Sequence, residues 1–99
     1  MDASMEPQII LPTRNAVATV FGEVLRSART QMGGVSQEEL AEMADIDRTY
    51  PSLLERGLRT PTLFMVIRIA LALGSRPGDV VDNVMARWRD CRHERKNEA

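Results

Sequence analysis

The sequence predicts an all-helical protein made of five helices. Apolar residues recur along the chain at spacings of three and four, which is the period of an amphipathic helix. Glycines at positions 33–34, 57 and 74 follow directly after such stretches, where helices commonly end. No stretch alternates polar and apolar residues as a half-buried strand would. A chain of 99 residues can form one modest core, which a helical bundle fills with local contacts.

The first two predicted helices are marked by their ends. Apolar residues from Val17 to Met32 fall on one face of the first helix, and Gly33-Gly34 stops it. The second helix begins at Ser36, whose hydroxyl can accept a hydrogen bond from the backbone N–H of Glu39 while the Glu39 side chain reaches back. This pattern is a capping box. We expect the second helix to run to about Ala44.

The remaining three helices follow from caps and from hydrophobic pattern. The third is predicted over residues 47–57, with an aspartate as its N-cap and a glycine after its last turn. The fourth, residues 63–73, is capped by Thr62. Because it is apolar on most of its faces, we expect it to be the most buried helix. The fifth starts at Pro77 and continues to about Arg92 or beyond.

Composition limits the class of protein. The formal net charge of −1 gives no overall basic surface, so a nucleic-acid interface needs segregated charge. The single cysteine, Cys91, cannot form an intrachain disulfide. The N-terminal segment lacks the features of a signal peptide, and no apolar run is long enough to span a bilayer. We therefore expect a cytoplasmic protein without membrane contact and without a cofactor or metal site, His93 being a lone histidine.

The predicted organisation has three parts: a flexible arm over residues 1–14, one domain over residues 15–92, and a charged tail over residues 93–99. Within the domain, only Asp45-Ile46-Asp47 separates the second helix from the third. Such a tight corner holds the third helix with one face outward, at an angle that lets it enter a DNA major groove.

Five motifs follow one another in order: Phe21-Gly22-Glu23-Val24-Leu25-Arg26, Val35-Ser36-Gln37-Glu38-Glu39-Leu40-Ala41, Leu54-Glu55-Arg56-Gly57, Pro61-Thr62-Leu63 and Ile69-Ala70-Leu71-Ala72-Leu73-Gly74. Through them the chain resembles the lambda-repressor-like, or XRE, family of helix-turn-helix transcription regulators. The resemblance implies a five-helix DNA-binding domain with an extended C-terminal helix. It also implies a homodimer that binds double-stranded DNA sequence-specifically at a pseudo-palindromic operator, and therefore a nucleoid-associated protein.

The resemblance assigns residues to the DNA interface. Gln37 matches a glutamine that contacts a phosphate at the start of the second helix. Arg48 matches an exposed position of the recognition helix, where it can contact guanine O6 and N7 or, alternatively, a phosphate. The other residues carried over are Thr49, Ser52 and Leu53 on the recognition helix and Arg56 and Arg59 behind it.

The resemblance also implies a structural ion pair between Arg29 and Glu55, which would brace the first helix against the third. The chain departs from the family pattern in three places, one of which is a Gly33-Gly34 link that is one residue longer than usual. Asp45 stands where the turn usually has a glycine in the left-handed region. Pro51 would be the fourth residue of a helix capped by Asp47, so we expect it to remove the first backbone hydrogen bond of that helix.

The fifth helix carries a stripe of apolar residues, Val81, Val84, Met85 and Trp88, which we predict to form the homodimer interface. Packing of Trp88 in the core of its own chain is the alternative.

A second function class is open: a protein-interaction module of the same fold, antitoxin-like or a polymerase adaptor, with weak or no DNA binding. Pro51, Leu53 and the acid-rich second helix favour it. RNA polymerase or a partner regulator is a further candidate partner. An enzyme is not expected, because the sequence has no nucleophile–base pair, no metal-ligand cluster and no phosphate-binding glycine loop.

Overall fold

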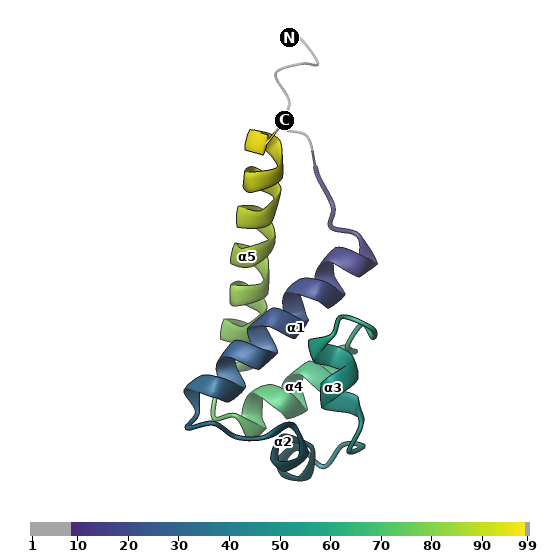
Figure 1. Ribbon diagram of the computed structural model, residues 1–99, viewed down its shortest axis with the longest axis vertical. Helices are drawn as coiled ribbons and strands as arrows, with labels where there is room; N and C mark the ends of the chain where they lie inside the picture. The colour runs from purple at the N-terminus through teal and green to yellow at the C-terminus, as the bar shows by residue number, and fades with distance from the viewer. Residues whose placement is uncertain (1–8, 99) are drawn as a thin grey trace, which may run out of the picture.

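The computed structural model describes the backbone of residues 9–98 and the side chains of residues 9–92, and this part of the chain contains helices and no strand. The predicted all-helical, five-helix fold is confirmed (Figure 1). The helices are α1 (Arg14–Gln31), α2 (Gln37–Ala44), α3 (Tyr50–Glu55), α4 (Leu63–Ala72) and α5 (Pro77–Glu98). Over residues 9–98, none of these helices has both the length and the apolar character needed to cross a bilayer.

Helix α1 lies across the middle of the molecule (Figure 1). It packs against α3 on one side and α5 on the other, while α2 packs against α3 and α4, and α4 packs against α5. The C-terminal half of α5 extends away from the end of the molecule that holds α2 and α3 (Figure 1). The two short helices α2 and α3 are therefore held at one end by α1 and α4.

The core lies where these helices meet. Leu40 of α2, Leu54 of α3 and Ala70 of α4 have no exposed surface, and they join a single apolar cluster with residues of α1 and α5. Trp88 of α5 belongs to this cluster and is only 9% exposed. The structure thus places Trp88 in the core of its own chain, so an exposed indole no longer supports a dimer interface on α5.

The ends of two helices differ from the sequence prediction. Helix α1 begins at Arg14, because the Thr13 hydroxyl accepts a hydrogen bond from the Ala16 backbone N–H at 3.1 Å and caps the helix. The end of the predicted arm is thus the start of α1. Helix α5 continues to Glu98, so the predicted charged tail is helical up to that residue. Residues 1–8 of the predicted arm lie outside the described residues.

The prediction that the fourth helix is the most buried is wrong. Val66, Ile69 and Ala70 of α4 are buried, but three large apolar side chains are mostly exposed. A helix that is apolar on most faces needs neighbours on most faces, and α4 has extensive contacts only with α2 and α5. The exposed face of α4 consists of Leu63, Phe64, Ile67 and Leu71.

Helices α1 and α3 approach closely at Gly22. A Cβ atom at this position would lie 2.5 Å from the carbonyl oxygen of Leu54 and 2.8 Å from that of Glu55. Both contacts are with backbone atoms, so a side chain cannot be accommodated by a rotamer change. Gly22 therefore sets how closely the C-terminal end of α3 can pack on α1.

We expect Gly22→Ala to lower the free energy of unfolding by about 2 kcal/mol, because the overpacking outweighs the roughly 1 kcal/mol that alanine adds in helix propensity. Thermal unfolding followed by circular dichroism checks this. Gly78→Ala is the matched control, since a Cβ on Gly78 of α5 meets nothing within 4 Å; it should be neutral or slightly stabilising. Equal melting temperatures for the two variants would contradict the packing role of Gly22.

Candidate nucleic-acid interface

The predicted capping box starts α2. The Ser36 hydroxyl accepts a hydrogen bond from the Glu39 backbone N–H at 3.0 Å, and the Ser36 backbone N–H donates to the Glu39 carboxylate at 3.3 Å. These two bonds satisfy donors that the helix itself cannot pair. The first residue of α2, Gln37, is thereby fixed at a helix N-terminus, whose partial positive charge favours anions.

Asp45 makes the turn after α2. Its backbone lies in the left-handed region, with φ 54° and ψ 54°, as the sequence predicts for this position. Arg68 of α4 supports this turn: its Nε donates to the Ala44 carbonyl at 3.0 Å, and its Nη2 lies 3.3 Å from Asp45 Oδ2. The guanidinium also lies 5.1 Å from the centroid of the Phe64 ring. A long side chain of α4 thus neutralises the C-terminal end of α2.

Asp47 does not act as the N-cap of α3. Instead, its carboxylate accepts hydrogen bonds from the hydroxyl and the backbone N–H of Thr49, which close a turn ahead of the helix. Both hydrogen bonds lower the pKa of Asp47, and the bond from the Thr49 hydroxyl has the larger effect. The stabilisation that they give is therefore complete at neutral pH and is lost only as the pH falls through this lowered pKa.

The predicted effect of Pro51 on the recognition helix is wrong, because α3 begins later in the chain than the sequence predicts. Because α3 begins at Tyr50, Pro51 lies in the first turn, where backbone N–H groups have no partner within the helix. Pro51 therefore removes no hydrogen bond from the helix interior. Its ring is among the most deeply buried side chains of the protein. The proline both starts α3 and anchors it in the core.

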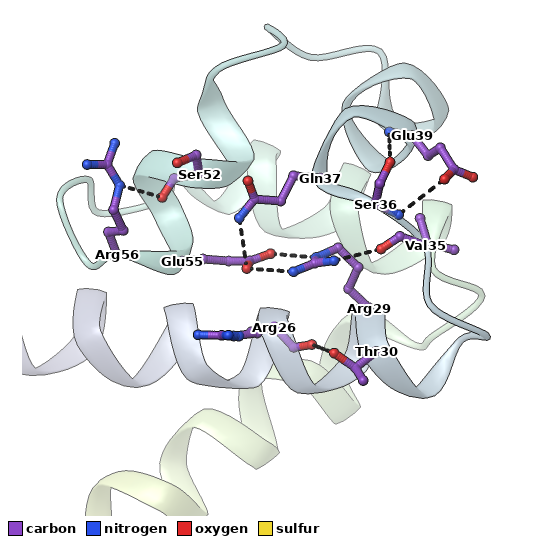
Figure 2. A network of polar contacts seen from close by, with 10 residues as sticks. All are labelled: Arg26, Arg29, Thr30, Val35, Ser36, Gln37, Glu39, Ser52, Glu55 and Arg56. Carbon is purple, nitrogen blue, oxygen red and sulfur yellow. Dashed lines mark hydrogen bonds and ion pairs between the residues drawn. The ribbon is translucent and has the colours of Figure 1, made fainter.

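A polar network joins α1, α2 and α3 (Figure 2). Arg29 of α1 donates from Nε and Nη2 to the two carboxylate oxygens of Glu55 of α3, at 2.8 and 2.9 Å. Its Nη1 donates to the Val35 carbonyl at 2.7 Å, and Gln37 Nε2 donates to Glu55 at 3.0 Å. The hydrogen bonds to Glu55 raise the pKa of Arg29. Burial lowers this pKa by less, and the negative charge of Glu55 adds a smaller rise. The network fixes the recognition helix relative to its two neighbours.

The outer face of α2 and α3 has a shallow depression. Arg48 stands beside it, and its Nη2 lies 2.9 Å from Glu38 of α2. Both side chains are largely exposed, at 77% and 67%, so this ion pair is worth at most about 1 kcal/mol and can open readily. The residues that line the depression are Gln37, Glu38, Arg48, Thr49, Ser52, Leu53 and Arg56.

A helix-turn-helix family model matches residues 25–80, more than half of the chain. The chain belongs to the XRE-type helix-turn-helix family. This family consists of DNA-binding transcription regulators, and the resemblance noted from the sequence is thereby confirmed.

Members of this helix-turn-helix family are similar to the chain in sequence and in structure. The chain is 40% identical over 68 residues to the control protein C.BamHI of Bacillus amyloliquefaciens. This match covers 69% of the chain and 84% of C.BamHI. Among solved structures, the restriction-modification controller protein C.AhdI of Aeromonas hydrophila matches with a TM-score of 0.62 and 38% identity, covering 66% of the chain and 97% of C.AhdI. The clp gene regulator ClgR of Corynebacterium glutamicum matches with a TM-score of 0.76 and 25% identity over 93% of the chain and 90% of ClgR.

The structure gathers most of the residues that the sequence assigned to DNA. Six of the seven, all except Arg59, line the depression. Arg59 is exposed in the loop after α3, beside Arg14 and Asn15 at the start of α1. On α5, Val84 and Met85 are partly buried against the core, and Val81 is exposed. In the part of the chain that the structure describes, no His, Cys, Asp or Glu side chains cluster as metal ligands would; the side chain of His93 lies outside it.

Two residues of the interface were not assigned to it from the sequence. Glu38 was considered only as part of an acidic helix. Its spacing from Arg48 gave no signal, because Glu38 lies in α2 and Arg48 lies in the turn ahead of α3. Arg68 was given no role from the sequence. An arginine inside an otherwise apolar helix is itself a usable signal, since such a side chain commonly reaches a carbonyl or a carboxylate.

We expect Arg29→Met to lower the free energy of unfolding by about 2–3 kcal/mol, because Glu55, whose side chain is 5% exposed, would keep a charge largely out of water with most of its hydrogen bonds lost. Urea unfolding measures this loss. In the double variant Arg29→Met/Glu55→Met no charge is left buried, so stability should recover substantially. A single variant as stable as the original chain would show that the pair does not hold α3.

Proposed function

We propose that the chain is a homodimer that binds a pseudo-palindromic operator in double-stranded DNA and thereby regulates transcription. The gathering of six predicted contact residues on the outer face of α2 and α3 supports this proposal most strongly. A twofold dimer would present this face to two half-sites about one helical turn, or roughly 34 Å, apart. Arg48, Arg56 and Arg59 are exposed around this face and supply local positive charge beside the acidic side chains of α2.

The side chains around the depression suggest a division of roles. Arg48 has the length and the exposure to form two hydrogen bonds with guanine O6 and N7. Leu53, half-buried beside it, offers an apolar contact for a thymine methyl group. Arg56 and Arg59 lie beyond the helix and are suited to phosphates, which position the protein without reading sequence. Gln37 can add a phosphate contact at the N-terminus of α2.

The named relatives support a narrower proposal for the regulated genes. C.BamHI and C.MunI are control proteins, and C.AhdI is a restriction-modification controller. The chain is 37–40% identical to these three proteins, against 25% for the clp gene regulator ClgR. We infer that its operator lies upstream of restriction-modification genes and of its own gene. Footprinting of the DNA upstream of its own gene tests this inference.

Salt-dependent binding to duplex DNA tests the function itself. The logarithm of the binding constant should fall with the logarithm of salt concentration, with a slope of about −0.9 for each phosphate neutralised. The footprinted duplex should bind at least about a thousandfold more tightly than random DNA. Binding no tighter than to random duplex at moderate salt would contradict the proposal and would favour a protein-interaction module of the same fold.

We expect Arg48→Ala to weaken operator binding by about 1–3 kcal/mol per half-site while leaving thermal stability nearly unchanged, since its one ion pair is exposed. Fluorescence anisotropy and thermal unfolding measure the two effects. The matched control is Arg89→Ala, which removes an exposed arginine from α5. An equal loss of affinity in both variants would indicate a general charge effect instead of a contact by Arg48.

We expect Glu38→Gln to raise the affinity for random duplex DNA by up to about fivefold, because the substitution frees Arg48 and removes a negative charge near the phosphates. Anisotropy titration with a random duplex measures this change. Glu23→Gln is the control, since Glu23 is an exposed glutamate of α1 outside the depression. Unchanged affinity in Glu38→Gln would mean that Glu38 does not restrain Arg48.

A further inference from the structure

A groove lies between the start of α1 and the loop that joins α3 to α4. Arg14 and Asn15 of α1 line it on one side, and Arg59 of the loop lines it on the other. The start of α1 lies over this loop (Figure 1). The two segments are in close contact, because a Cβ atom added at Gly57 would lie 3.3 Å from the Cα of Thr19. Two arginines from distant parts of the sequence therefore border one groove.

We propose that Arg14 binds a phosphate of the operator in addition to those that α2, α3 and the loop after α3 contact. The inference deepens the proposed function and depends on it, since the phosphate belongs to the proposed operator DNA. The groove adjoins the depression on α2 and α3, because Arg56 lines the depression and its neighbour Gly57 lines the groove. A DNA backbone that leaves the depression on this side would therefore meet both arginines of the groove.

The charge of the groove fits an anion. Two arginines line it, and the described residues of its lining include no carboxylate. The depression differs in this respect, since Glu38 lies there beside Arg48. The side chains of Asn15 and Thr60 can donate further hydrogen bonds to phosphate oxygens. A phosphate in the groove would therefore meet a positive charge that no carboxylate of the lining offsets.

The position of Arg14 in α1 does not serve the fold. Its side chain is exposed and forms no ion pair with another residue of the described part of the chain. Arg14 is the first residue of α1, directly after the Thr13 cap. A helix N-terminus carries a partial positive charge, so a cation in this place is unfavourable for the helix. A phosphate would neutralise the arginine and would also interact favourably with the helix end.

Arg14 lies outside the part of the chain that the family shares. The family model matches residues 25–80, and all seven residues that the resemblance assigned to DNA fall within this range. Helix α1 begins before it, at Arg14. The proposed contact would therefore extend the DNA interface of the family and would not repeat one of its positions.

Salt titration of duplex binding by the full chain tests the proposal. Arg14→Gln should weaken binding to the footprinted duplex and to a random duplex alike, by about fivefold for each bound copy at about 0.15 M salt, because a phosphate contact reads no sequence. The slope of the logarithmic salt dependence should become shallower by about 0.9 for each copy. Arg14→Lys keeps the charge and should keep the slope. The matched control is Arg76→Gln, which removes an exposed arginine directly before α5, in a different hollow, and should change neither quantity.

Thermal unfolding separates a DNA contact from a structural role. The melting temperature of Arg14→Gln should be unchanged or slightly higher, since the substitution removes a cation from a helix N-terminus. Unchanged affinity and slope in Arg14→Gln would overturn the proposal. A loss of affinity for the footprinted duplex alone would also overturn it, because that result would indicate a contact with a base.

Phosphate ethylation interference gives an independent test, because ethylation removes the negative charge of single phosphates in the footprinted duplex. The original chain should be sensitive to one more phosphate in each half-site than Arg14→Gln is, and identical patterns would contradict the contact. The two proposals can fail separately. An original chain that binds the footprinted duplex no more tightly than random DNA refutes the proposed function, and this inference with it. Specific operator binding with the same salt slope and the same ethylation pattern in Arg14→Gln refutes this inference alone.

Discussion

The partly buried ion pair between Arg29 and Glu55 is the interaction on which the arrangement of the domain most depends. It connects α1 to the last residue of α3, and the Gln37 amide and the Val35 carbonyl bring the start of α2 into the same network. Gly22 allows α3 to approach closely enough for these bonds to form. The pair adds little net energy over an apolar contact of equal size, but it accepts only one orientation of α3. Its contribution is therefore the placement of the recognition helix.

The proposed DNA-binding face combines this rigid support with exposed side chains. Pro51 and Leu54 anchor α3 in the core, whereas Arg48 is held only by a weak exposed pair with Glu38. Opening this pair would free the arginine without a loss of packing. While the pair is closed, the carboxylate of Glu38 offsets the charge of Arg48.

Much of this structure is readable from local sequence signals. The capping box at Ser36, the left-handed turn at Asp45 and the cap at Thr62 are set by residues a few positions apart, so the sequence predicts them correctly. The start of α3 was misplaced because Asp47 can cap a helix or close a turn, and Pro51 decides between the two. The burial of Trp88 and the exposure of α4 depend on which helices become neighbours, and no local pattern contains that information. The same holds for Glu38 and Arg68, whose partners lie 10 and 23 residues away.

The shortness of α3 has a consequence for the supply of active protein in a cell. A helix of six residues is not stable by itself in water, so the recognition surface exists only while α1 and α2 hold it. Unfolded copies therefore do not present this surface. For the proposed regulator, the concentration that can bind DNA then equals the concentration of folded protein, so a core substitution that shifts the folding equilibrium changes the dose of active protein.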